Sequence, residues 1–131
     1  MRIIIAGGRD FNNYNYLREG VKNIISLLER ENHGITESIV FVSGGARGAD
    51  SLGEQFANYE GYPVKRFPAE WKTYGRKAGP IRNEQMAKYA AQDQGVLIAF
   101  WDHKSKGTES MIRLAHANRV RIYLFSYSNN F

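Results

Sequence analysis

Residues 39–50 of the chain read IVFVSGGARGAD, and this stretch decides the fold. Its first four residues are apolar and mostly β-branched, which is typical of a strand buried on both faces. The strand runs directly into three glycines, two alanines and a serine, and Asp50 or Ser51 is suited to cap a following helix. A strand, a turn with little side-chain bulk and a helix in this order indicate part of a βαβ unit.

The same alternation extends in both directions along the chain. Apolar runs predict strands at 2–6, 39–42, 64–67, 96–101 and 121–125. Helical spacing of apolar residues predicts four helices. The first spans 14–31, and the second runs from its cap at 50 or 51 to the break at 61. The third spans 81–91, and the fourth runs from the turn at 102–108 to about 118. Such an alternation predicts a three-layer α/β fold of Rossmann type: a five-stranded parallel sheet with helices on both faces. The alternation does not fix the order of the strands, and we expect 3-2-1-4-5 because this is the usual order in Rossmann folds. Pro68 places the third strand toward the sheet edge.

Length and composition limit the possible classes of protein. A chain of 131 residues predicts a single domain, 1–131, with a short polar tail from 126 onward. The absence of cysteine excludes disulfides and thiolate chemistry, and three scattered histidines predict neither a metal site nor a cofactor. The first predicted strand begins at Arg2, which leaves no room for a signal peptide, and no apolar run is long enough to cross a membrane. We therefore expect a cytoplasmic protein without a membrane partner. The net charge of +5 favours phosphorylated or polyanionic partners.

Glycine, a small polar residue and a cation follow the first, second and fourth predicted strands. In a parallel sheet these turns share one edge, where helix N-termini present unpaired N–H groups to an anion. We therefore expect a phosphate site at this edge, formed by Gly7, Gly8, Arg9, Asp10, Ser43, Gly44, Gly45, Ala46, Arg47, Gly48, Asp50, Lys106, Gly107 and Thr108. Each turn also has a purely structural interpretation. The first turn could hold a surface Arg9–Asp10 pair, the second could allow close helix–sheet packing, and the turn after the fourth strand could be a solvated basic turn.

A basic and aromatic segment at 69–80 is predicted to be a long functional loop. Arg82 and Asn83 begin the helix after it, and we expect both to point toward the glycine edge. Trp71 and Tyr74 could stack on a base, but packing of these aromatics against the core is the favoured interpretation. The glycine turns match neither G-x-G-x-x-G nor the P-loop, so hydride transfer and Mg-dependent NTP hydrolysis have no direct support.

The chain resembles the YspA-like branch of the SLOG superfamily over nearly its whole length. The resemblance rests on four blocks of sequence in order: 7–11, 43–50, 79–83 with Met86, and 106–108. The wider relatives of this branch include the LOG phosphoribohydrolases and DprA. The resemblance implies a Rossmann-like domain that binds nucleotide-derived ligands, often as a homodimer. Arg82 looks like an arginine that LOG enzymes use and is the one catalytic candidate. Met111 stands where those enzymes have glutamate, and the neighbouring Glu109 faces elsewhere on the helix, which argues against N-glycosidic hydrolysis.

Three functions follow from these patterns. The first is a domain that binds, and senses or processes, a phosphate-containing nucleotide derivative. The second is a LOG-like phosphoribohydrolase, which would release a base from a nucleotide. The third is a DprA-like binder of single-stranded nucleic acid, suggested by the net charge of +5 and by Lys72, Arg76 and Lys77 beside the two aromatics.

Overall fold

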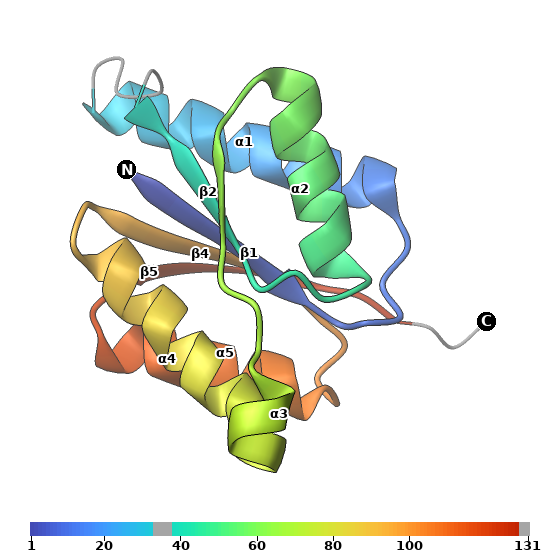
Figure 1. Ribbon diagram of the computed structural model, residues 1–131. Helices are drawn as coiled ribbons and strands as arrows, with labels where there is room; N and C mark the ends of the chain where they lie inside the picture. The colour runs from blue at the N-terminus through green and yellow to red at the C-terminus, as the bar shows by residue number, and fades with distance from the viewer. Residues whose placement is uncertain (33–37, 129–131) are drawn as a thin grey trace.

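The computed structural model describes residues 1–32 and 38–128. Five strands form one parallel sheet in the order β3-β2-β1-β4-β5 (Figure 1). They are β1 (Arg2–Gly7), β2 (Val40–Ser43), β3 (Val64–Arg66), β4 (Gly95–Trp101) and β5 (Arg121–Ser126). The predicted fold class and strand order are confirmed, including the position of the third strand at the edge.

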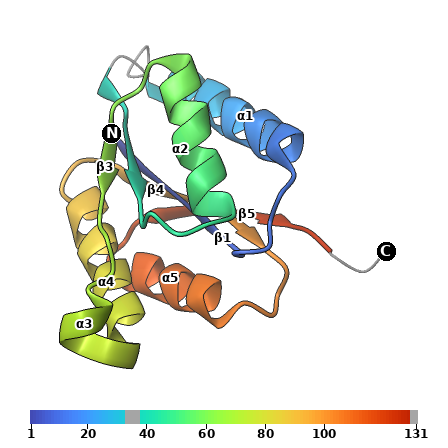
Figure 2. The same cartoon turned by 45° about the vertical axis from the view of Figure 1, so that its right-hand side comes forward.

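Helices cover both faces of the sheet (Figures 1 and 2). One face carries α1 (Tyr14–Asn32) and α2 (Ala49–Glu60), and the other carries α4 (Ala78–Ala91) and α5 (Lys106–Ala117). A short α3 (Trp71–Tyr74) and the 3₁₀ helix η2 (Gly75–Lys77) lead into α4. The chain therefore crosses from one face to the other after β3, at the carboxyl edge of the sheet.

The central strand β1 shows why the sheet is buried on both faces. Ile3 and Ile5 pack in the hydrophobic cluster under α1 and α2, whereas Ile4 and Ala6 pack in the cluster under α4 and α5. Alternate residues of a strand point to opposite faces, so a strand between two helical layers must be apolar throughout. At Gly53 in α2, an added Cβ would lie 2.7 Å from the Cβ of Ile5, so this glycine lets α2 approach the sheet closely.

The prediction of a loop at 69–80 was wrong. Residues 71–77 form α3 and η2, and α4 begins at Ala78 rather than at 81. Pro80 is the third residue of α4, a position where a backbone N–H would have no partner within the helix and its loss costs nothing. Ala78, only 1% exposed, anchors this first turn in the core.

Two smaller predictions about helix and chain ends also need correction. Gly48 precedes α2 with φ of 81°, and no side chain caps the helix; Asp50 instead accepts a bond from the N–H of Ala46 at 3.2 Å. The tail predicted from 126 begins later, because Ser126 belongs to β5 and Tyr127 packs edge-on against Phe11, with ring centroids 4.8 Å apart. Residues 33–37, which follow the predicted first helix, and 129–131 lie outside the described residues.

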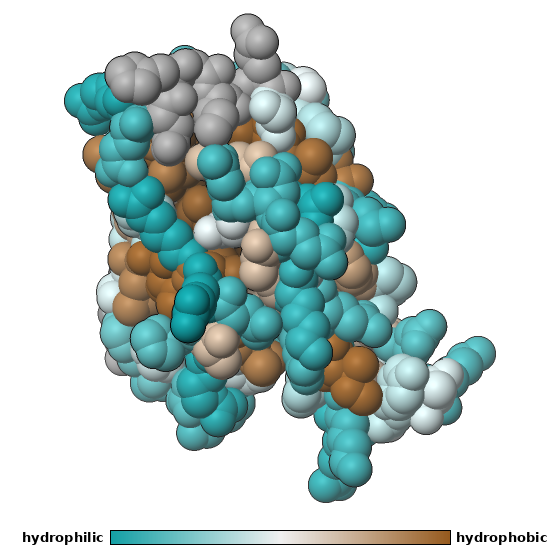
Figure 3. All heavy atoms as spheres, turned by 90° about the vertical axis from the view of Figure 1, so that its left-hand side faces the viewer, coloured by the Kyte–Doolittle hydropathy of each residue, from teal (hydrophilic) through white to brown (hydrophobic). Residues whose placement is uncertain are grey.

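Figure 3 shows a face on which hydrophilic side chains predominate and hydrophobic ones are visible in smaller areas between them. Within the part of the chain that the structure describes, no helix is both long enough and apolar enough to cross a membrane.

Candidate ligand-binding site

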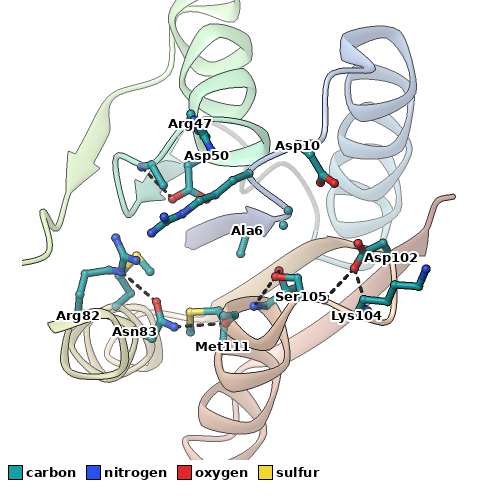
Figure 4. Close-up of a pocket in the computed structure, with 17 residues that line it drawn as sticks. Ala6, Asp10, Arg47, Asp50, Arg82, Asn83, Asp102, Lys104, Ser105 and Met111 are labelled. Atoms are coloured by element: carbon teal, nitrogen blue, oxygen red, sulfur yellow. Dashed lines mark hydrogen bonds between the residues drawn. The ribbon is translucent and has the colours of Figure 1, made fainter. Parts of the chain in front are cut away.

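The turns after β1, β2 and β4 meet at the carboxyl edge of the sheet and line an open cleft of about 530 Å³ (Figure 4). Arg47 of the β2 turn and Asp50 of the first turn of α2 line one side of this cleft, and Asp102, Lys104 and Ser105 of the β4 turn line another. The start of α4 closes a third side. A volume of this size lies within the range of small-molecule sites, and the position is the one at which open parallel sheets bind ligands. We call it the main cleft.

Gly48 fixes the distance between the first two turns. A Cβ at this position would collide with the backbone of Gly8 and Arg9, and its φ of 81° is unfavourable for other residues. The carbonyl of Gly8 also accepts the N–H of Ala49 at 3.2 Å. The two turns are thus joined backbone to backbone, and Gly48 serves this packing.

The β2 turn satisfies part of its own backbone. The Ser43 hydroxyl accepts the N–H of Gly45 at 3.0 Å and donates to Glu54 at 2.6 Å, in a buried position. Asp50 accepts the N–H of Ala46. These two amides are therefore engaged by side chains of the turn and of α2, so fewer backbone N–H groups of the turn are available to an anion than the sequence suggested.

Arg82 joins α4 to the β2 turn. Its Nη1 donates to the carbonyl oxygen of Gly44 at 2.6 Å, and its Nε donates to the side-chain oxygen of Asn83 at 3.0 Å. A Cβ at Gly44 would lie 2.5 Å from that Nη1, so Gly44 leaves space for the guanidinium. Burial lowers the pKa of Arg82, and the charge of Asp50 opposes this change. The guanidinium is thereby held in place at the cleft wall before any ligand binds.

Asp50 is a buried carboxyl group at the back of the main cleft. Burial raises its pKa to about 6, against the opposing effects of the Ala46 N–H bond and the charges of Arg82 and Arg9. Shifted pKa values of this kind cluster at functional sites, although structural ion-pair networks also produce them.

The β4 turn is organised by two side chains. Asp102 accepts the N–H groups of Lys104 and Ser105, both at 2.9 Å, and the Lys104 bond is the largest contribution to its lowered pKa. The Ser105 hydroxyl caps α5 by accepting the N–H of Thr108 at 3.3 Å. Asn83 donates to the carbonyl of Gly107 at 3.4 Å, which connects this turn to α4.

The structure brings most of the predicted site residues together. The main cleft is lined by Gly7, Gly8, Arg9, Asp10, Ala46, Arg47, Asp50, Arg82, Asn83, Gly107 and Thr108. Gly44 and Gly45 line a second cleft, and Ser43, Gly48 and Lys106 line neither. Asp10, which lines the main cleft, accepts a hydrogen bond from the Tyr127 hydroxyl at 3.0 Å.

Some lining residues were not among the predicted ones. The main cleft also includes Ala6, Met86, Asp102, Lys104, Ser105 and Met111. In the β4 turn, Lys104 takes the place that we predicted for Lys106. Asp102 and Ser105 could have been predicted from the sequence, since Asp and Ser directly after a parallel strand commonly organise the next turn and cap the next helix.

The favoured interpretation of Trp71 and Tyr74 as core residues was wrong. Their side chains are 50% and 43% exposed, and α3 contributes no buried residue. Trp71 lines the second cleft, whereas Tyr74 lines neither cleft. The interpretation failed because the segment is a short surface helix and not a loop folded against the core.

Comparison with known proteins identifies the family. The sequence pattern of the YspA, cpYpsA-related SLOG family (YAcAr) matches residues 1–74. The chain is 30% identical over 129 residues to the Gene 61 protein of Mycobacterium phage D29, and the match covers 95% of each chain. No solved structure gives a significant match. The protein therefore belongs to this SLOG family, and its membership indicates a function in binding or processing a nucleotide-related ligand.

The described residues contain no group of three or more His, Cys, Asp or Glu side chains placed to hold a metal ion. The ionisable side chains that line the main cleft are three guanidiniums, one ammonium and three carboxyl groups, namely Arg9, Arg47, Arg82, Lys104, Asp10, Asp50 and Asp102.

Proposed function

We propose that the protein binds a phosphate-bearing nucleotide derivative in the main cleft. The observation that carries this proposal is the convergence of Arg9, Arg47 and Arg82 on one cleft from three separate elements: the β1 turn, the β2 turn and α4. Guanidinium groups match the geometry of phosphate oxygens and form two parallel hydrogen bonds to them. Three such groups at one wall suit a ligand with more than one negative charge.

The rest of the main cleft suits a nucleoside. Asp10, Asp50 and Asp102 can accept hydrogen bonds from sugar hydroxyls, and an ionised carboxylate would repel a phosphate placed directly on it. Met86 and Met111 are buried at the cleft and provide an apolar surface for a ring. The phosphate is accordingly expected at the arginine wall and the sugar near the carboxyl groups.

Ligand-induced stabilisation tests the proposal. AMP, ADP-ribose, cyclic ADP-ribose, NAD and other nucleoside monophosphates are added in turn while thermal unfolding is followed. A ligand at about 100 times its Kd should stabilise the fold by about 2.7 kcal/mol. Hydrogen bonds to charged groups contribute about 1.5–3 kcal/mol, so Arg47→Ala should weaken binding at least about tenfold.

The matched control is Arg113→Ala, which removes an exposed arginine of α5 that lines neither cleft. It should leave the affinity unchanged. If none of the compounds stabilises the protein, or if both arginine variants bind equally well, the proposed function is wrong.

Hydrolysis of the N-glycosidic bond is a second candidate, favoured by one observation. Asp50 is buried beside Arg82 with a pKa of about 6, and a carboxyl group with such a pKa can exchange a proton with a water or a leaving base near neutral pH. Incubation with each nucleotide, followed by chromatography for free base, tests it. Release of free base by the wild type, and its loss in Asp50→Asn, would support hydrolysis. If no nucleotide that binds is cleaved, the protein binds nucleotides without hydrolysing them.

A further inference from the structure

A second cleft of about 670 Å³ adjoins the main cleft on the β3 side. Arg9, Ala46, Arg47 and Arg82 line both clefts and therefore form the wall between them. The second cleft is completed by Gly44, Gly45, Arg66, Pro68, Ala69 and Trp71. The cations that we assign to phosphate thus lie between two cavities and not at the end of one.

The two clefts differ in charge. The main cleft has three carboxyl groups in its lining, whereas the described residues that line the second cleft include four arginines and no carboxyl group. Of these four, Arg66 is paired with Glu54, which accepts from its Nε at 3.0 Å and from its Nη2. This pair fixes the plane of the guanidinium and leaves Nη1 for a ligand. Negative charge on a ligand is therefore most favourable at the shared wall and on its β3 side.

Trp71 offers the second cleft an aromatic surface. Its side chain is half exposed, and its ring lies against the start of α4, since a Cβ at Gly79 would be 3.5 Å from the indole Cη2. A large aromatic side chain held on a helix and open to a cationic cleft suits stacking on a planar base. Pro68 and Ala69 add small apolar contacts beside it.

We infer that the ligand has two ends joined by a diphosphate, and that the second cleft binds an aromatic base at the second end. The diphosphate lies across Arg9, Arg47 and Arg82, one nucleoside occupies the main cleft, and the other base stacks on Trp71. This inference rests on the proposed function and specifies its ligand as a dinucleotide linked 5′ to 5′. A mononucleotide would fill one cleft and leave the other empty, because each alone is large enough for a small ligand.

Calorimetric titration with AMP, ADP-ribose and diadenosine 5′,5′-diphosphate tests the inference. The three probes supply one base with one phosphate, one base with a diphosphate, and two bases with a diphosphate. Diadenosine diphosphate should bind at least about tenfold more tightly than ADP-ribose, since stacking of one base has about this effect. Trp71→Ala should remove this advantage and leave AMP affinity unchanged, whereas Trp71→Phe should retain most of it.

Tyr74→Ala is the matched control, because Tyr74 is an aromatic of α3 with a similar exposure that lines neither cleft. It should change none of the three affinities, and thermal melts of all variants show whether they fold. If AMP binds but the second base adds nothing, or if Trp71→Ala weakens AMP as much as diadenosine diphosphate, the inference is overturned while the proposed function stands. If none of the three probes binds, the proposed function itself fails.

Discussion

Replacing Asp50 by asparagine should remove a specific dependence of folding stability on pH. In the folded protein, burial raises the pKa of Asp50 from the ordinary value of 3.8 to about 6. The folded state therefore holds this proton more tightly than the unfolded chain does. As pH rises, the unfolded chain ionises first, and the free energy of unfolding falls until the folded state has also lost the proton.

The size of the effect follows from the two pKa values. A tenfold change in proton affinity is worth about 1.4 kcal/mol, so a rise from 3.8 to about 6 corresponds to about 3 kcal/mol. The loss should develop between about pH 4 and about pH 6 and be complete above that range. Asparagine can still accept the N–H of Ala46 that Asp50 accepts at 3.2 Å, so the turn keeps this hydrogen bond.

Urea unfolding of the wild type and of Asp50→Asn at a series of pH values provides the measurement. The stability of the variant relative to the wild type should increase by about 3 kcal/mol between about pH 4 and about pH 8. Glu84→Gln is the control, because it removes an exposed carboxylate of an i,i+4 pair with Lys88 and should shift stability by less than about 0.5 kcal/mol at any pH. Parallel pH profiles for the wild type and Asp50→Asn would refute the assigned burial and pKa of this group.

Four further outcomes are expected. Gly48→Ala should lower the free energy of unfolding by about 2–4 kcal/mol, measured in urea, because an added Cβ collides with neighbouring backbone and the φ of 81° is strained. Tyr127→Phe should cost only about 0.5–1 kcal/mol in the same assay, since it removes a partly solvated bond to Asp10. ADP-ribose should bind more tightly at about pH 5.5 than at about pH 7.5, because protonation of Asp50 removes a negative charge that offsets the positive charges of Arg82 and Arg9, and Asp50→Asn should abolish this difference. If the exposed residues 72–77 bind single-stranded nucleic acid, an oligonucleotide should shift the protein at low salt and lose affinity steeply as salt rises; no shift at low salt excludes this function.

Much of the candidate site could be predicted because it follows from local signals and one rule of topology. Glycines directly after apolar strands mark the turns, and a parallel sheet places the carboxyl ends of its strands at one edge. Arg9, Arg47 and Arg82 could therefore be expected near one another although they are far apart in the chain. Arg66 carried no comparable signal, because β3 ends without a glycine turn and its apolar pattern is weak.

The five strands, the four long helices, the two-sided burial of the sheet and the edge at which the turns meet all follow from the sequence, because hydrophobic period and glycine position act locally. The short helices α3 and η2 and the use of individual side chains became clear only from the tertiary structure. The Ser43 hydroxyl and Asp50 engage amides expected to be available for phosphate, Trp71 is exposed at a second cleft, and Lys104 takes the place of Lys106. These outcomes depend on distances of a few ångströms between segments remote in the chain, which no local pattern encodes.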